Sequence, residues 1–356
     1  MLKARLSPVP GLITIILFFL LGDVAMFSCT DRPATPGVST TAETQKRETN
    51  NKPLRKVRLL PYWVPSAQFA GYYMGIEKGI FRKHGLDLEI LPFDPVMPVD
   101  EVIKDKKTDF ALLWMVNAIE IRDKGVEIVD IAQFSSRSSL MLITRKSSGI
   151  NEIGDMNGKR AGIWLGYEMQ PQALFRKYHL DVKVVSIGST NNLFLRGTVD
   201  ILNANWYDEY HSLLNNGINE DELNKFFFAD YGLNFLEDGM YCLAETGRRD
   251  PELCREFINA TVESWNYAFD HQEETIDVIE KYARKHNQPF NQAHQQWMLS
   301  HYRTMYIPAG RKDINTWLQQ KDYENIQRIM MESHFITHVT PYREFFQPCN
   351  NPGQTR

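Results

Sequence analysis

The sequence predicts an α/β protein with two lobes, each built around its own sheet. Segments typical of strands and helices alternate between residues 57 and 244, and the alternation starts a second time near residue 155. From residue 245 to about residue 333 the pattern is almost entirely helical. Strands that alternate with helices favour a parallel sheet with helices on both faces. A chain of 356 residues is long enough for two such lobes.

The first lobe is expected to comprise residues 56–142, with a helical return over residues 245–346. Pro65 and Ser66 suit the start of its first helix, and Gly79 suits the position just past its end. The predicted elements are strand 57–60, helix 68–78, strand 86–91, helix 98–105, strand 109–113, helix 117–124 and strand 126–134.

The second lobe is expected to comprise residues 143–244, and residues 347–356 form a tail. The predicted elements are a crossing strand at 140–144, a second start at 155–164, helix 170–178, strand 182–187, helix 192–196, strand 199–203, helix 208–215 and a return strand at 240–244. In such open sheets, ligands bind at the carboxyl ends of strands, where connections diverge. An α/β enzyme with a helical tail is the alternative that this pattern leaves open.

The N-terminal segment indicates export rather than a folded element. A basic stretch precedes an apolar run at residues 11–21, which is shorter than the roughly 20 residues of a membrane span. We expect a signal peptide at residues 1–28, a lipidated Cys29 and a disordered tether over residues 29–55. The protein would then be anchored to the membrane by its lipid, in the periplasm or at the cell surface. An unlipidated cleaved signal and an uncleaved anchor are the alternatives.

Composition argues against several classes of function. A net charge of −4 gives no electrostatic reason to expect nucleic acid as a partner. Besides Cys29 the chain contains Cys242, Cys254 and Cys349, and an odd number gives no disulfide framework. The sequence lacks metal-ligand spacing and the common hydrolase, metalloprotease and nucleotide-binding motifs. We therefore expect no metal, no cofactor and no catalytic residue.

Several segments together carry a resemblance to a known family. They are WVPSAQFAGYYMGIEKGIFRKHGL at 63–86, TDFAL at 108–112, MNGKR at 156–160, GTVD at 197–200, WYDEY at 206–210, DYG at 230–232 and LEDG at 236–239. In this order they resemble periplasmic binding proteins for thiamine-pyrimidine precursors and sulfonates. The resemblance implies a type II periplasmic-binding-protein fold and a monomeric receptor that delivers a small molecule to an ABC permease in the membrane.

The same family includes a eukaryotic enzyme that makes the thiamine pyrimidine from its own histidine and pyridoxal phosphate. The resemblance places that enzyme's Schiff-base lysine at Leu113 and its substrate histidine at Asn117. Leucine cannot form an imine, and asparagine cannot supply the ring. The enzyme's cysteine-rich iron motif would fall near residues 238–242, where only Cys242 is present. A synthase-like enzyme of thiamine biosynthesis is therefore kept only as an alternative.

Aromatic and amide side chains that follow the predicted strands would face a cleft between the lobes. Flat rings suit a planar heterocycle, which they bury by offset stacking, and amides form hydrogen bonds in both directions. Packing in the core or hinge would explain the rings equally well, and surface polarity would explain the amides. The candidate ligand-binding residues are Trp63, Gln68, Phe69, Trp114, Asn117, Trp164, Tyr167, Glu168, Tyr207 and Glu209.

Glu209 is the candidate that would select the ligand. The resemblance implies that a glutamate of this motif contacts the amino side of a pyrimidine ring. A carboxylate there favours hydrogen-bond donors or cations and repels sulfonates. Glu168 is an alternative at a similar place, and a solvated acid favoured by a helix dipole would be the structural explanation. The expected ligand is a small nitrogen heterocycle, a thiamine-pyrimidine precursor, with taurine or an alkanesulfonate as the alternative.

Overall fold

The computed structural model describes residues 53–188 and 190–349. The expected signal peptide at 1–28 and the expected lipidation site at Cys29 therefore lie outside the described residues, as does most of the expected tether. Within the described part, no helix has both the length and the apolar character needed to cross a membrane.

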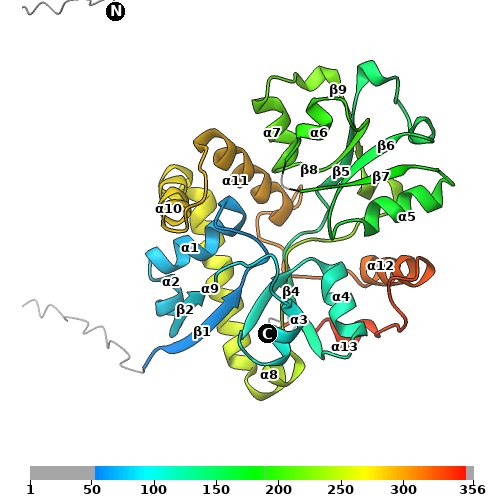
Figure 1. The fold of residues 1–356 in the computed structure, drawn as a ribbon. Coiled ribbons are helices and arrows are strands. Elements are labelled where there is room, and N and C mark those ends of the chain that lie inside the picture. Colours follow the sequence, from blue (N-terminus) through cyan, green and yellow to red (C-terminus); the bar gives the residue numbers. More distant parts are fainter. Residues whose placement is uncertain (1–52, 189, 350–356) are drawn as a thin grey trace, which may run out of the picture. The chain divides into compact units, whose positions relative to one another are not determined.

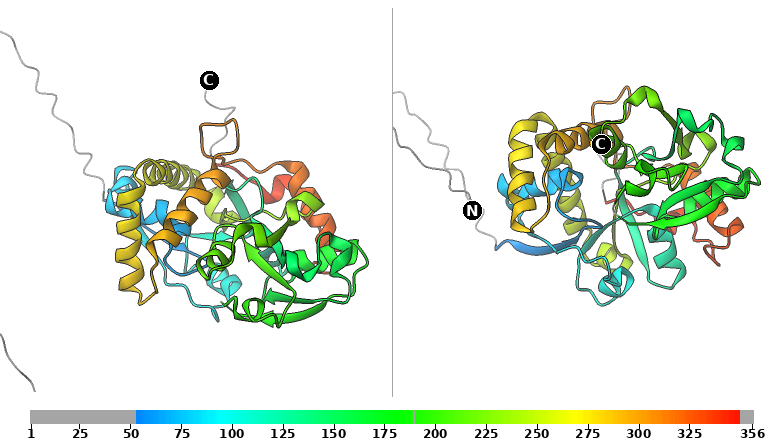
Figure 2. Two further views of the ribbon diagram at one scale, coloured as in Figure 1. Left: turned by 90° about the horizontal axis from the view of Figure 1, so that it is seen from above. Right: turned by 45° about the horizontal axis from the view of Figure 1, so that its top comes forward.

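The described chain forms two five-stranded sheets with helices around them (Figure 1). In spatial order, the first sheet contains β2 (Leu86–Ile90), β1 (Arg55–Leu60), β3 (Phe110–Leu113), β10 (Gly239–Leu243) and β4 (Ile128–Gln133). The second contains β7 (Lys183–Ile187), β6 (Arg160–Trp164), β8 (Ile201–Asn205), β5 (Leu140–Arg145) and β9 (Leu223–Phe227). In both views of Figure 2, the green second lobe lies beside the blue and yellow segments of the first. The predicted two-lobed α/β fold is thus confirmed.

Both sheets are mixed, so the expectation of parallel sheets is wrong. Strand β10 runs antiparallel to both of its neighbours, β3 and β4. Strand β5 likewise runs antiparallel to β8 and β9. The chain reaches each of these two strands from the other lobe. A strand that runs parallel to the strand before it in the same sheet needs a crossover helix, and neither β5 nor β10 is preceded by one. The chain therefore changes sheets between β4 and β5 and again between β9 and β10, slightly before residues 142 and 244.

Strand β1 begins earlier than the pattern predicts. Arg55, expected as the last tether residue, already pairs with Leu86 of β2. The Arg55 guanidinium also forms an ion pair with Asp250. The backbone and side chain of Arg55 therefore belong to the folded lobe.

Thirteen α-helices occur in the described residues. They are α1 (Ala70–Glu77), α2 (Ile80–Lys83), α3 (Val99–Lys104), α4 (Met115–Asp123), α5 (Met169–Lys177), α6 (Asn192–Leu195), α7 (Glu209–Asn215), α8 (Ala244–Arg249), α9 (Pro251–Asp270), α10 (Gln272–Lys285), α11 (Gln292–Tyr306), α12 (Gln320–Glu332) and α13 (Tyr342–Phe345). The predicted helical C-terminal region is present, although α12 also reaches the second lobe, because Arg176 of α5 donates to the Ser333 carbonyl.

Successive residues of a strand belong to different apolar cores, one on each face of the sheet. In β1, Val57 and Leu59 pack with α1, α9 and α11, whereas Leu60 packs with α3 and α4 on the opposite face. In β5, Met141 and Ile143 pack with α7, whereas neighbouring strand residues face α5. Because successive side chains of a strand point to opposite faces, each sheet is covered on both sides. The carboxyl ends of β1, β3, β6 and β8 remain available at the junction of the lobes.

Two chain crossings join the lobes through a buried polar contact. The Glu237 carboxylate, on the second crossing, accepts hydrogen bonds from the Ser138 hydroxyl and the Ser139 backbone amide, on the first, both at 2.9 Å. The Ser135 hydroxyl also donates to the Glu237 carbonyl. Burial and the neighbouring Asp238 raise the pKa of Glu237 to about 8. The two crossings are thus hydrogen-bonded to each other, one residue before Leu140, which lines the cavity described next.

Candidate functional site

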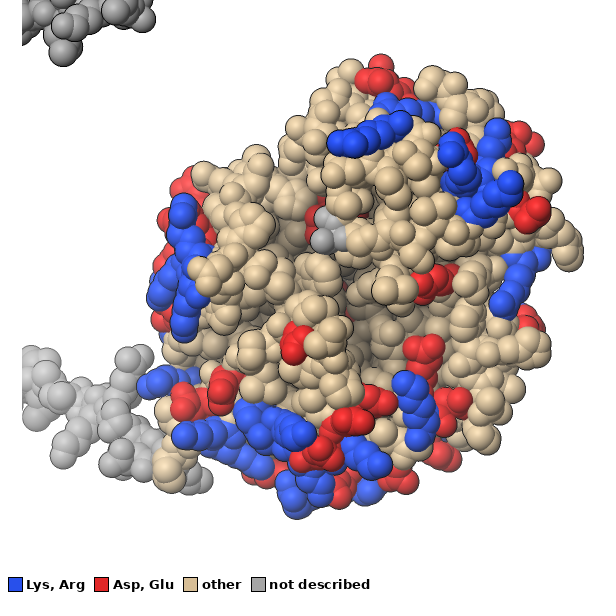
Figure 3. Space-filling model, viewed as in Figure 1, with Lys and Arg blue, Asp and Glu red and all other residues tan. Residues whose placement is uncertain are grey.

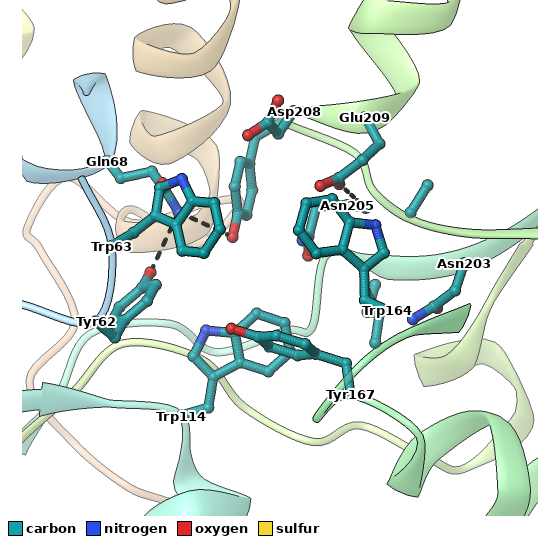
Figure 4. Close-up of a pocket in the computed structure, with 13 residues that line it drawn as sticks. Tyr62, Trp63, Gln68, Trp114, Trp164, Tyr167, Asn203, Asn205, Asp208 and Glu209 are labelled. Carbon is teal, nitrogen blue, oxygen red and sulfur yellow. Dashed lines mark hydrogen bonds between the residues drawn. The ribbon is translucent and has the colours of Figure 1, made fainter. Parts of the chain in front are cut away.

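A cavity lies between the lobes, at the carboxyl ends of strands from both sheets (Figure 4). It contains about 460 Å³ of space, part of which is open to solvent. That position is typical of small-molecule sites in α/β proteins. Its lining residues are Tyr62, Trp63, Gln68, Trp114, Leu140, Trp164, Tyr167, Asn203, Ala204, Asn205, Tyr207, Asp208 and Glu209.

Two pairs of aromatic rings, each with one ring from either lobe, form the walls. Trp63, after β1, meets Trp164, at the end of β6, with ring centroids 6.0 Å apart and planes at 68°. Trp114, after β3, meets Tyr167 at 4.8 Å and 69°. The indole N–H groups of Trp114 and Trp164 have no hydrogen-bond partner. These walls therefore offer aromatic faces to the cavity, and two buried indole N–H groups stand behind them without a partner.

A network of hydroxyl and amide groups forms the side of the cavity that belongs to the first lobe. The Gln68 amide nitrogen donates to the Tyr207 hydroxyl at 3.2 Å and to the Tyr302 hydroxyl at 3.3 Å. The Tyr62 hydroxyl donates to Asp238 at 2.6 Å. Burial raises the pKa of Asp238 to about 7, although the hydrogen bonds from Tyr62 and Tyr302 oppose that shift. The Gln68 amide is thus held in place by side chains from both lobes.

Glu209 forms the opposite, polar side. It is the first residue of α7, yet the residue is only 8% exposed, so it is not a solvated helix-start acid. One carboxylate oxygen accepts from the Asn205 backbone amide at 2.7 Å. Burial, and next the charge of Asp208, raise the pKa of Glu209 well above its usual range. The carboxyl group can therefore hold its proton near neutral pH.

Asp208 connects this side of the cavity to the first lobe. Its carboxylate lies 3.0 Å from Nε2 of His294 on α11. Nδ1 of the same ring lies 3.0 Å from Nδ1 of His211 on α7. Nearby, the Trp297 indole donates to the Trp206 carbonyl at 3.1 Å. Helices α7 and α11 thus hold the lobes together beside the cavity.

The charge of the cavity distinguishes between ligand classes. Its described lining contains two acidic side chains, Asp208 and Glu209, and no lysine or arginine. The buried Asn203 side-chain oxygen also lacks a donor. On the face shown in Figure 3, mostly uncharged residues and some acidic atoms border the hollow between the lobes, and the lysines and arginines lie towards the periphery. Such a cavity favours hydrogen-bond donors or cations over anions.

Seven of the ten residues predicted from the sequence line this cavity. Phe69 does not: it is 1% exposed in the core of the first lobe, against Tyr62. Asn117 lies on α4 in a neighbouring cavity that it shares with Glu120. Glu168 precedes α5 and is partly exposed outside the cavity. These three residues were expected at the site and are not brought to it.

The structure adds polar residues that the sequence interpretation missed. Asn203 and Asn205 form the end of β8, Asp208 precedes α7, and Tyr62 follows β1. All four lie at the end of a strand or within three residues after it, which is the position that led to the aromatic candidates. If polar residues near strand ends had also been taken as candidates, these four residues would have been identified.

The structure supplies no group for the synthase reaction at the tested positions. Leu113 is the last residue of β3, 5% exposed and paired with Gly239. Within the described residues, no group of histidine, cysteine and acidic side chains could hold a metal ion.

Comparison with known proteins gives partial matches in thiamine metabolism. The chain is 28% identical over 110 residues to the Saccharomyces cerevisiae 4-amino-5-hydroxymethyl-2-methylpyrimidine phosphate synthase THI5, which is 30% of this chain and 32% of the synthase. It is 25% identical over 152 residues to a Haemophilus influenzae protein whose name assigns it to thiamine biosynthesis, which is 42% of this chain and 44% of that protein. The chain therefore spans less than half of the length of either relative.

A longer match involves a vitamin-binding protein. The riboflavin-binding protein RibY of Chloroflexus aurantiacus is 22% identical over 262 residues, which is 69% of this chain and 71% of RibY.

Solved structures show the fold. The periplasmic aliphatic sulphonate binding protein SsuA of Escherichia coli matches with a TM-score of 0.66 and 13% identity, over 85% of this chain and 95% of SsuA. A Candida albicans protein described as having the generic periplasmic binding protein fold matches with a TM-score of 0.57 and 12% identity, over 85% of this chain and 100% of that protein. The chain therefore has the periplasmic-binding-protein fold that the resemblance implied.

The family follows from the sequence match. The profile of the family described as NMT1/THI5 like matches residues 66–275, which begin beside the first aromatic wall and end within α10. This segment contains both crossings and nearly every residue that lines the cavity. Because the match covers more than half of the chain, the protein belongs to the NMT1/THI5-like family.

Proposed function

We propose that this protein is the ligand-binding component of an ABC importer and that it captures a small amino-substituted nitrogen heterocycle, a thiamine-pyrimidine precursor. The observation that carries the proposal is the lining of the cavity, which combines aromatic walls from both lobes with two acids and no basic side chain. The names of the relatives in thiamine metabolism support the same class of ligand, and the fold supports a role as a binding component.

The walls fit a planar ring after a small rearrangement. Two indole faces on either side of a flat ring need about 7 Å between them, twice a contact distance of ~3.5 Å. Trp63 and Trp164 lie 6.0 Å apart in an edge-to-face arrangement. We therefore expect both rings to turn and to move apart by about 1 Å as the ligand enters.

The polar side fits an aminopyrimidine edge. Burial raises the pKa of Glu209, so its carboxyl group can pass a proton to a ring nitrogen of the ligand and then accept hydrogen bonds as a carboxylate. An aminopyrimidine presents an amino donor next to such a ring nitrogen, so its edge would offer two donors to the Glu209 carboxylate, which an amide at this position could not match. A sulfonate offers acceptors only and carries a negative charge, so it would be repelled by the Asp208 carboxylate and would meet no basic side chain in the lining. The sulfonate alternative therefore has the likeness to SsuA in its favour but not the cavity.

We infer binding rather than catalysis. The synthase alternative needs an amine at residue 113 and a histidine at residue 117, where this chain has Leu113 and Asn117. Partial matches to the synthase leave its activity a property of that enzyme.

A thermal-shift screen tests the ligand class. The compounds are 4-amino-5-hydroxymethyl-2-methylpyrimidine, thiamine, riboflavin, taurine and an aliphatic sulfonate. A ligand at 100 times its Kd stabilises the folded state by about 2.7 kcal/mol, which raises the melting temperature by several degrees. We expect this shift with the aminopyrimidine. A shift with taurine alone would favour the sulfonate alternative, and a shift with riboflavin alone would favour a role like that of RibY.

We further propose that lipidated Cys29 anchors the protein to the membrane. A diacylated cysteine carries more than one acyl chain, which firm anchoring requires. The Cys29→Ser variant should move to the soluble fraction. If it stays with the membrane while the apolar run at residues 11–21 is intact, the uncleaved anchor is the correct interpretation.

A further inference from the structure

Three cysteines that are distant in the sequence meet in the first lobe. Cys242 lies in β10, Cys254 lies in the first two turns of α9, and Cys349 follows α13. All three are free thiols. Cys242 and Cys254 belong to the same buried cluster of the first lobe, and Cys349 packs against that cluster. The Cys254 thiol is close enough to each of the other two to affect its pKa. We refer to Cys242, Cys254 and Cys349 as the thiol cluster.

Backbone pairing brings the C-terminal segment to this place. Phe346 forms a parallel bridge with Asp130 of β4, and the Gln347 amide donates to the Asp130 carbonyl at 2.8 Å. Strand β4 pairs with β10, where Cys242 lies opposite Val129. The segment that carries Cys349 is thus hydrogen-bonded to the strand beside Cys242.

The members of the cluster differ in access and in acidity. Cys242 is 2% exposed and Cys254 is fully buried, whereas Cys349 is partly exposed. The hydrogen bonds from Cys242 and Cys349 lower the pKa of the Cys254 thiol, and the same contact raises the pKa of Cys349. A thiolate is the nucleophile in disulfide exchange. The cluster therefore contains one buried nucleophile and one thiol within reach of an external reagent.

We propose that Cys254 and Cys349 form a disulfide in the presence of a disulfide oxidant and so fasten the C-terminal segment to α9. Cys349 first passes its proton to the neighbouring Cys254 thiolate, and the resulting Cys349 thiolate attacks the disulfide of the oxidant. The half of the oxidant that is released takes that proton from Cys254 and leaves as a thiol. The Cys254 thiolate then attacks the Cys349 sulfur and releases the second thiol. Two protein thiols are oxidised, one disulfide of the oxidant is reduced, and the two protons end on the released thiols.

Cys349 is the favoured partner of Cys254 for two reasons. It is the member of the cluster that an oxidant can reach. A bond from residue 254 to residue 349 also closes a much longer loop than one from residue 242 to residue 254, and longer loops restrict the unfolded chain more. Cys242, which contacts Cys254 as well, remains as a third thiol that can exchange.

The test uses the full chain with Cys29→Ser as the common background, so that the cluster supplies the only thiols. The reduced protein is incubated with oxidised glutathione, alkylated and mapped by mass spectrometry. We expect a peptide pair linked through Cys254 and Cys349, and a melting temperature at least about 3 °C above that of the reduced protein.

Matched variants decide which thiols react. Cys242→Ala should keep the linked pair, whereas Cys254→Ala should lose it and leave Cys349 as a mixed disulfide with glutathione. Alanine fills a buried site without a polar atom, and circular dichroism of each variant verifies folding. The proposal is overturned if the unmodified cluster stays reduced, stops at the mixed disulfide, or links Cys242 to Cys254 instead.

Discussion

Replacing Glu209 with glutamine tests how the cavity selects its ligand. Glutamine keeps the size of the side chain and one acceptor, so the hydrogen bond from the Asn205 amide, 2.7 Å in the native protein, can be retained. What the substitution removes is the acid, which can donate a proton to a ring nitrogen or accept from an amino group as a carboxylate. Folding stability should therefore change little, while recognition should suffer.

The magnitude follows from burial. Glu209 is 8% exposed, so water cannot readily replace a hydrogen bond that it loses. A hydrogen bond to a charged group contributes about 1.5–3 kcal/mol, which corresponds to a roughly 10- to 100-fold loss of affinity. We expect titration calorimetry with 4-amino-5-hydroxymethyl-2-methylpyrimidine to show a loss in this range for Glu209→Gln.

Glu168→Gln is the matched control for this experiment. Glu168 also lies at the start of a helix in the second lobe, but it is outside the cavity. Its replacement should leave the Kd within about twofold of the native value, as for surface changes in general. If Glu209→Gln binds as tightly as Glu168→Gln, the carboxyl group does not read the ligand, and the argument from the polar side of the cavity fails.

Three further results are expected. Trp164→Ala should weaken binding at least about tenfold, because the ligand loses stacking area. Leu165→Ala, at the exposed neighbouring position, should have no effect in the same titration. Equal losses in both variants would contradict the claim that Trp164 forms a wall of the binding site. The free energy of unfolding should fall as pH rises from about 5 to about 8, because burial raises the pKa of Glu237 to about 8 and that of Asp238 to about 7, so the folded state binds more protons than the unfolded state across this window. Glu237→Gln should flatten this dependence in denaturant titrations, and an unchanged slope would refute the assignment. Mixing with pyridoxal phosphate should give no borohydride-reducible absorbance band at the cleft, because Leu113 has no amine; such a band would restore the synthase alternative.

The two-lobed fold could be predicted because strand and helix patterns alternate in order along the chain. Strand direction could not be predicted in the same way. Strands β5 and β10 look like any other apolar strand, and only the crossing between lobes makes them antiparallel. Strand β9 escaped notice because its five residues, LNKFF, have little alternation and follow an acidic turn.

The site could be predicted where position along a strand decides which way a side chain points. Trp63, Trp114 and Trp164 follow strands and line the cavity. Gln68 and Phe69 show the limit of this reasoning, because they are adjacent residues of one short 3₁₀ turn. The side chain of Gln68 lines the cavity, whereas that of Phe69 packs in the core of the first lobe. Sequence spacing alone does not fix the direction of side chains in such a turn.

The thiol cluster could not be predicted at all. Its three members come from a strand, a helix and the C-terminal segment, and an odd number of cysteines gives no pairing rule. Only the pairing of the C-terminal segment with β4 brings Cys349 to the other two.

The most direct test of the central claim is a calorimetric titration of the native protein with 4-amino-5-hydroxymethyl-2-methylpyrimidine and, separately, with taurine. A cavity with aromatic walls, two acids and no basic residue predicts saturable binding of the pyrimidine at one site, with a Kd of about 1 μM or tighter, and no heat of binding for taurine. Saturable binding of taurine without binding of the pyrimidine would contradict the account.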